Sequence, residues 1–118
     1  MLAGEFAFVS GIGNGIGRFD RTTGEFVDSV TIPGDSCEAL DSGFGAAWTA
    51  TCRGPGLARI DAVTGVVTIA DLGGQIPDPE ASIGVGEGGV WIIVGSGSPR
   101  TLLRVDPVTM SVIAEYEI

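Results

Sequence analysis

The chain has 118 residues, of which 44% are hydrophobic and 20 are glycine, and it carries a formal net charge of −9 with no histidine. This length allows one domain, and the charge argues against binding to nucleic acid or to an anionic membrane surface, since both require basic side chains. No apolar run approaches the ~20 residues of a membrane-spanning helix. Short β-branched segments alternate with Gly and Pro, which predicts an all-β fold.

Three copies of one short pattern recur along the chain, at residues 16–24, 57–65 and 102–110. The recurring pairs are Arg18 and Asp20, Arg59 and Asp61, and Arg104 and Asp106, with the aspartates spaced 41 and 45 residues apart. An aspartate that accepts backbone N–H groups ahead of it, followed four residues on by a glycine, predicts a tight turn between two strands. Met110 replaces the glycine in the third copy, where a left-handed backbone would cost about 1 kcal/mol.

The segments between the turns have the apolar patterns of short strands. In chain order, the predicted strands are 5–10, 17–20, 25–32, 38–41, 46–52, 57–61, 66–72, 80–85, 90–95, 101–106 and 111–118. They fall into three units, 5–33, 37–73 and 79–118, of which the first lacks its innermost strand. Trp48 and Trp91 occupy equivalent strands, and Phe6 is the predicted counterpart in the first unit.

Each complete unit has four antiparallel strands in about 40–45 residues, which is the size of a β-propeller blade. In the second unit the relevant residues are Ala46-Ala47-Trp48, Leu57-Ala58-Arg59-Ile60-Asp61 and Thr64-Gly65. They resemble the blade signature of the virginiamycin B lyase-like, YncE-like and NHL-related propellers, in which a Gly-rich turn precedes a Trp strand and an Arg-Ile-Asp turn follows. The resemblance covers nearly the whole chain and implies about 2.75 blades. It indicates little about activity, because such propellers serve many roles.

An incomplete set of blades would leave an apolar face uncovered at each end, whereas a repeat array needs its ends capped or joined. We therefore expect either a piece of a longer propeller or a chain that assembles with copies of itself or with other subunits. Two copies would give about six blades, within the usual range. The last predicted strand would place Val112, Ala114 and Tyr116 on one face. A monomeric β-sandwich is the alternative fold.

Cys37 and Cys52 are the two cysteines of the chain. If residues 42–45 form the turn of a regular hairpin, these two positions lie opposite each other, which predicts a disulfide. A disulfide implies an oxidising, extracytoplasmic compartment, although no signal peptide is visible at the N-terminus. Two buried free thiols are the alternative. A site for a thiophilic metal is disfavoured, since two cysteines without histidine give too few ligands.

Glu38 and Glu80 start the innermost strands of the second and third units. In a propeller such positions surround the central channel, where carboxylates can bind a cation or a polar ligand. A solvated acidic rim is the alternative. Arg100, at the end of the loop 95–100, is a further candidate for a ligand contact.

The repeated side chains also have two interpretations. The Arg–Asp pairs would contact an anion or a carbohydrate, or they would be structural, with each arginine held by carboxylates or carbonyls between blades. Repetition at equivalent places favours the structural role. Trp48 and Trp91 would stack on a ligand or pack between blades, and packing is favoured because a large aromatic contributes most where it is buried.

The residue types argue against catalysis by this chain alone. The resemblance implies that lyase-like relatives use histidine and acidic residues with a divalent metal, whereas this chain has no histidine and no lysine. Acid–base chemistry would depend on carboxylates alone. We expect a non-catalytic module for protein interaction or assembly, without a cofactor. The alternatives are a fragment of a lyase-like enzyme and a carbohydrate or cation binder at the channel mouth.

Overall fold

The computed structural model describes residues 2–12, 15–33, 36–51, 56–77, 83–95 and 100–118. These residues form twelve strands in three antiparallel sheets of four strands, and each sheet is built from consecutive strands. The prediction of an all-β chain with blade-like four-stranded sheets is confirmed. Among the residues described, no helix has the length and apolar character needed to cross a membrane.

The strands alternate in direction within each sheet, so short turns suffice to connect them. The first sheet contains β1 (Leu2–Ala3), β2 (Phe6–Ile12), β3 (Gly15–Asp20) and β4 (Phe26–Thr31). The second contains β5 (Ser36–Gly43), β6 (Ala46–Thr51), β7 (Gly56–Asp61) and β8 (Val67–Asp71). The third contains β9 (Ile83–Gly86), β10 (Gly89–Val94), β11 (Thr101–Val105) and β12 (Val112–Glu117).

The innermost strand of the first sheet differs from the sequence prediction, which had none. Leu2 pairs with Ala7, and Ala3 pairs with Phe6, so β1 is present as a strand of two residues. The hairpin between β1 and β2 forms because Gly4 takes a φ of 60°, a left-handed conformation that glycine adopts without a Cβ clash. The first sheet therefore repeats the four-strand order of the others.

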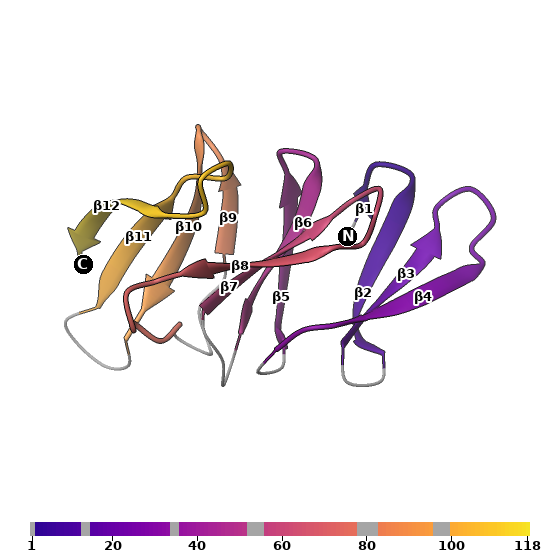
Figure 1. The fold of residues 1–118 in the computed structure, drawn as a ribbon, viewed down its shortest axis with the longest axis horizontal. Helices are drawn as coiled ribbons and strands as arrows, with labels where there is room; N and C mark the ends of the chain where they lie inside the picture. Colours follow the sequence, from indigo (N-terminus) through magenta and orange to yellow (C-terminus); the bar gives the residue numbers. More distant parts are fainter. Residues whose placement is uncertain (1, 13–14, 34–35, 52–55, 78–82, 96–99) are drawn as a thin grey trace.

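The three sheets stand in a row in chain order, with the second between the first and the third (Figure 1). Side chains alternate between the two faces of a strand, and two apolar clusters fill the spaces between neighbouring sheets. One cluster includes Phe8 and Ile16 of the first sheet with Ile60 of the second. The other includes Trp48 of the second sheet with Leu103 of the third. The first and third sheets therefore each have one face turned away from the second sheet, which we call the distal face.

Two details of register differ from the sequence predictions. Phe8 pairs with Arg18 as Trp48 pairs with Arg59, so Phe8 and not Phe6 is the counterpart of the tryptophans. The spacing was misleading because the β2–β3 connection is shorter and follows a register shift after Ser10. In β12, a register shift opposite Arg104 and Val105 turns Val112 toward the second sheet, whereas Ala114 pairs with Arg104.

The β5–β6 hairpin also has an irregular register. Leu40 pairs with Thr49 and Asp41 with Trp48, as a regular hairpin predicts. The register then shifts, so that Ser36 pairs with Thr51. The side chain of Cys37 and the whole of Cys52 lie outside the described parts of the chain. The disulfide stays a prediction.

Candidate interaction surface

The three repeated aspartates close three turns of the same shape. Asp20 Oδ1 accepts the N–H groups of residues 22 and 23 at 2.8 and 3.0 Å. Asp61 accepts from residues 63 and 64, and Asp106 accepts from residues 108 and 109, at 2.8–3.0 Å. Donation by these backbone amides holds the pKa of each of the three carboxyl groups below its ordinary value, because the bonds favour the ionised form.

The fourth residue after each aspartate has positive φ in all three turns. Gly24 and Gly65 have a φ of 76°, and Met110 has a φ of 61°. The Met110 N–H also donates to the Asp106 carbonyl at 2.9 Å, as the glycines do in their turns. Met110 is half-buried against the apolar cluster between the second and third sheets. The third turn therefore keeps its shape at a cost in backbone strain, and the thioether side chain gains a packing contact.

Arg18 joins the first sheet to the second. Its Nε and Nη2 donate to the two carboxylate oxygens of Asp28, each at 2.8 Å, and its Nη1 donates to the Val63 carbonyl at 3.1 Å. The guanidinium lies 4.5 Å from the centre of the Phe6 ring, and Arg18 is 7% exposed. Because Val63 belongs to the turn of the second sheet, this arginine binds its own sheet and the next one together.

Arg18 and its partners also affect one another's ionisation. The bidentate bond to Arg18 holds the pKa of the Asp28 carboxyl below its ordinary value. The pKa of Arg18 is raised, mainly by Asp28, and the negative charge of Asp61 in the neighbouring turn adds to this effect. The contact between the two sheets is therefore complementary in charge as well as in hydrogen bonding.

Arg59 occupies the same position in the second sheet. It lies 5.9 Å from the centre of the Trp48 ring and 3.6 Å from the Asp61 carboxylate. Together with Pro107, Val108 and Met110 it lines a small cavity between the second sheet and the turn of the third. The arginine of each of the first two sheets thus faces the Asp turn of the sheet that follows.

Arg104 occupies this position in the third sheet, on its distal face. It lies 5.4 Å from the centre of the Trp91 ring, and its Nη2 donates to the carbonyls of Glu87 and Gly88 at 3.3 and 3.4 Å. Its Nε is buried and has no hydrogen-bond partner among the described residues. This arginine therefore lacks the acceptors that Arg18 has, and an unsatisfied buried donor costs free energy.

The distal face of the third sheet has apolar residues at the positions that are buried on the matching face of the second sheet. Trp48, Leu57 and Ala70 of the second sheet are each 0% exposed, because the third sheet covers them. Their counterparts by register are Trp91, Leu102 and Tyr116. Trp91 and Leu102 are half-buried, and Tyr116 is 45% exposed and stacks on Trp91 with ring centres 6.1 Å apart.

The distal face of the first sheet is also apolar. Val9 is 42% exposed, whereas Thr49, its counterpart in the second sheet, is 0% exposed. Phe19 and Phe26 pack edge to face with ring centres 5.4 Å apart, and Phe26 is 55% exposed. These exposed aromatic and aliphatic groups form a candidate docking face at the opposite end of the row of sheets.

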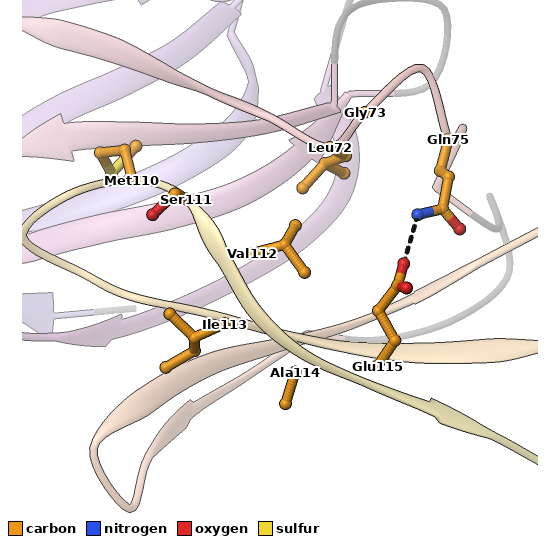
Figure 2. A pocket seen from close by; sticks show the side chains of 9 residues that line it. All are labelled: Leu72, Gly73, Gln75, Met110, Ser111, Val112, Ile113, Ala114 and Glu115. Atoms are coloured by element: carbon orange, nitrogen blue, oxygen red, sulfur yellow. Dashed lines mark hydrogen bonds between the residues drawn. The ribbon is translucent and has the colours of Figure 1, made fainter.

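A groove of about 740 Å³ lies between the end of β8 and the start of β12 (Figure 2). Leu72 and Val112 are apolar residues that line it, and Gln75 Nε2 donates to Glu115 Oε1 at 2.8 Å (Figure 2). The groove separates the outer strands of two neighbouring sheets. It contains one carboxylate among the residues that line it, so it offers little chemistry for a cation.

Of the predicted ligand residues, Arg100 is the one whose surroundings are described. It is exposed, and its backbone exchanges hydrogen bonds with Ile118 at 2.9 and 3.3 Å. The side chain of Glu38 and the whole of Glu80 lie outside the described residues, so the predicted carboxylate rim stays a prediction. In the described ranges, no group of three or more His, Cys, Asp or Glu could hold a metal ion.

Sequence reasoning missed the partners of the repeated arginines. The position opposite each arginine in the outer strand is Asp28 in the first sheet, Thr68 in the second and Ala114 in the third. Because this position does not repeat a residue type, no sequence pattern could predict the Arg18–Asp28 pair. The stacking of Tyr116 on Trp91 was missed for the same reason, since Ala70 takes the place of Tyr116 in the second sheet.

The fold and its contacts define an all-β chain of three repeated four-stranded antiparallel sheets, joined face to face, with apolar distal faces at both ends. Comparisons with protein-family models and with curated proteins found no match to the chain.

Proposed function

We propose that this chain is a non-catalytic segment of a β-propeller, and that it acts in protein assembly by presenting its distal sheet faces to further blades. The observation that carries the proposal is the distal face of the third sheet. Trp91, Leu102 and Tyr116 are partly exposed there, although the matching residues of the second sheet are completely buried. The resemblance of the repeats to virginiamycin B lyase-like, YncE-like and NHL-related blades supports the same conclusion.

The described carboxyl groups whose pKa is shifted have structural roles. Every carboxyl whose pKa is shifted has a lowered pKa, and the cause in each case is a hydrogen bond from a backbone amide or an arginine. These carboxylates are therefore suited to holding turns and joining sheets.

A fluorescence experiment tests whether the distal face of the third sheet accepts another blade. In a Trp48→Phe variant, Trp91 is the remaining tryptophan and reports on this face. The variant chain is extended after Ile118 by a second copy of residues 74–118 that carries Trp91→Phe. Acrylamide quenching of Trp91 should fall in the extended chain, because the added sheet covers the indole.

The matched control is an extension with Leu103→Asp in the added copy, which places a charge on the face that would pack. Quenching of Trp91 should then match that of the unextended chain, measured at dilutions where chains do not associate. Equal quenching with the intact and the disrupted extension would contradict the proposal.

A further inference from the structure

In each contact between sheets of the chain, an arginine of one sheet faces the Asp turn of the next sheet. In the part of the chain that the structure describes, the third sheet has such an arginine without a facing turn, and the first sheet has such a turn without a facing arginine. Arg18 reaches the turn of the second sheet, and Arg59 faces the turn of the third. Arg104 has no following turn to contact within the described residues. At the other end, the turn of the first sheet, residues 21–24, has no preceding arginine facing it there.

The turn of the first sheet has the features that would accept Arg104. The Val63 carbonyl, which accepts from Arg18, lies two residues after Asp61. Its counterpart in the first sheet is the carbonyl of Thr22, two residues after Asp20. A Cβ placed on Gly65 would lie 3.2 Å from Arg18 Cζ, whereas a Cβ on Gly24 would have no atom within 4 Å. The turn of the first sheet therefore has open space where the second has a guanidinium.

Charge and apolar surface also match across the two ends. Asp61 raises the pKa of Arg18 across the first contact between sheets, and Asp20 would stand in the same relation to Arg104. The apolar residues would meet as in the two internal clusters, with Trp91 and Tyr116 facing Phe19 and Phe26. A contact of this kind continues the two interfaces that already exist within the chain.

We propose that a second copy of this chain packs the distal face of its first sheet on the distal face of the third sheet, with Arg104 donating to the Thr22 carbonyl of the second copy. This inference rests on the proposed function and names the partner. The contact is heterologous, since it joins two different faces, and such contacts form a ring when the rotation closes. Two chains then form two identical contacts and a ring of six sheets, within the usual four to eight.

The first test is the mass in solution, measured by light scattering after size exclusion at two protein concentrations. The expected mass is twice the 12.0 kDa of one chain. A mass of one chain at both concentrations, or a mass that grows beyond two chains, would overturn the proposal.

Substitutions then test which faces make the contact. Tyr116→Asp should weaken the dimer by about thirtyfold or more, as is typical of a buried tyrosine at an interface. Ile113→Asp is the matched control, because Ile113 is on the same strand and is 49% exposed, but lines the groove beside the second sheet. Arg104→Glu provides a second disruption, because it reverses the charge of the side chain that would face Asp20 of the second copy. Circular dichroism verifies that each variant is folded.

Mixing separates this arrangement from one in which each distal face packs on the same face of the other copy. Phe26→Asp alters the first sheet, and Tyr116→Asp alters the third, so each variant should be monomeric by itself. An equimolar mixture should recover pairs, because one of the two contacts in a mixed pair is intact. Variants that fail to pair when mixed, or a Phe26→Asp variant that dimerises alone, would overturn the proposal.

The two proposals can fail separately. If the chain is monomeric but the extension after Ile118 still protects Trp91, the distal face accepts a blade, and the blade does not come from a second copy. If neither experiment shows protection or pairing, both proposals are wrong.

Discussion

The second and third sheets have the same strand order and the same Trp-over-Arg arrangement, and they differ in what covers them. Trp48 donates its indole N–H to the Gly43 carbonyl at 3.0 Å, and Trp91 donates to the Gly86 carbonyl at 3.1 Å. Trp48 is completely buried, whereas Trp91 is half-buried. Both sheets therefore have an apolar face suited to burial, but the face is buried only where a neighbouring sheet packs on it.

The largest expected effect concerns the two tryptophans. Trp48→Ala should lower the free energy of unfolding by about 3–5 kcal/mol, the usual cost of removing a buried aromatic. Trp91→Ala should cost about 1–2 kcal/mol in the single chain, since less apolar area is removed from contact. Urea unfolding followed by circular dichroism, at a concentration where chains are monomeric, measures both. Equal losses would show that the two faces are covered alike, and the comparison would no longer hold.

The next effect concerns the two arginines at matching positions. Arg18→Met should lower the free energy of unfolding by about 1–3 kcal/mol, because three charge-assisted hydrogen bonds are lost and the Asp28 carboxylate loses its partner. Arg104→Met should cost less than about 1 kcal/mol in the single chain, since its bonds to Glu87 and Gly88 are long.

A double-mutant cycle identifies the source of the larger effect. If Arg18 acts through its ion pair, Arg18→Met in an Asp28→Asn background should cost clearly less than in the unsubstituted chain. An unchanged cost would assign the effect to the Val63 carbonyl and the packing on Phe6.

The smallest effect is the dependence of stability on acid. The pKa of Asp20, Asp61 and Asp106 is lower in the folded chain than the ordinary ~3.9. The stability that these groups contribute is therefore complete above about pH 4 and is lost as the pH falls through the folded values. Thermal unfolding between about pH 5 and pH 2 should show a falling Tm.

Asparagine at the three positions keeps an oxygen that can accept the turn hydrogen bonds, but it does not titrate. A variant with Asp20→Asn, Asp61→Asn and Asp106→Asn should thus show a shallower fall in Tm. The remaining fall should include Asp28, whose pKa is also lowered. An identical slope would show that the turn aspartates do not contribute to the acid sensitivity.

Most of the architecture could be predicted because its signals are local and repeated. The Asp turns and the glycines between apolar segments mark the strand ends, and eleven of the twelve observed strands overlap a predicted strand. The details that failed depend on irregular pairing. A register shift opposite Arg104 moves Val112 to the face that packs on the second sheet. The residue pattern of the strand does not indicate this shift.

For the contacts between sheets, the type of contact could be predicted, but not the residues that make it. Repetition of arginine before aspartate suggested an arginine held between blades, but its acceptors could not be named. One acceptor, Asp28, occurs in a single repeat, and the other is a backbone carbonyl of Val63, which has no residue type to recognise. Contacts of this sort depend on how neighbouring sheets are placed, and a strand pattern does not contain that information.

The residue four places after each turn aspartate has a consequence for the order in which sheets can be joined. A Cβ at Gly65 would crowd the Arg18 guanidinium, which Asp28 holds in place, whereas Met110 carries a full side chain beside Arg59. Exchanging the second and third sheets in the gene would therefore place a methionine against Arg18 and strain the first contact. We expect shuffled genes to yield folded chains when a sheet whose arginine is held like Arg18 still precedes a sheet with a glycine turn. The residue at this turn position therefore limits which repeats can follow one another.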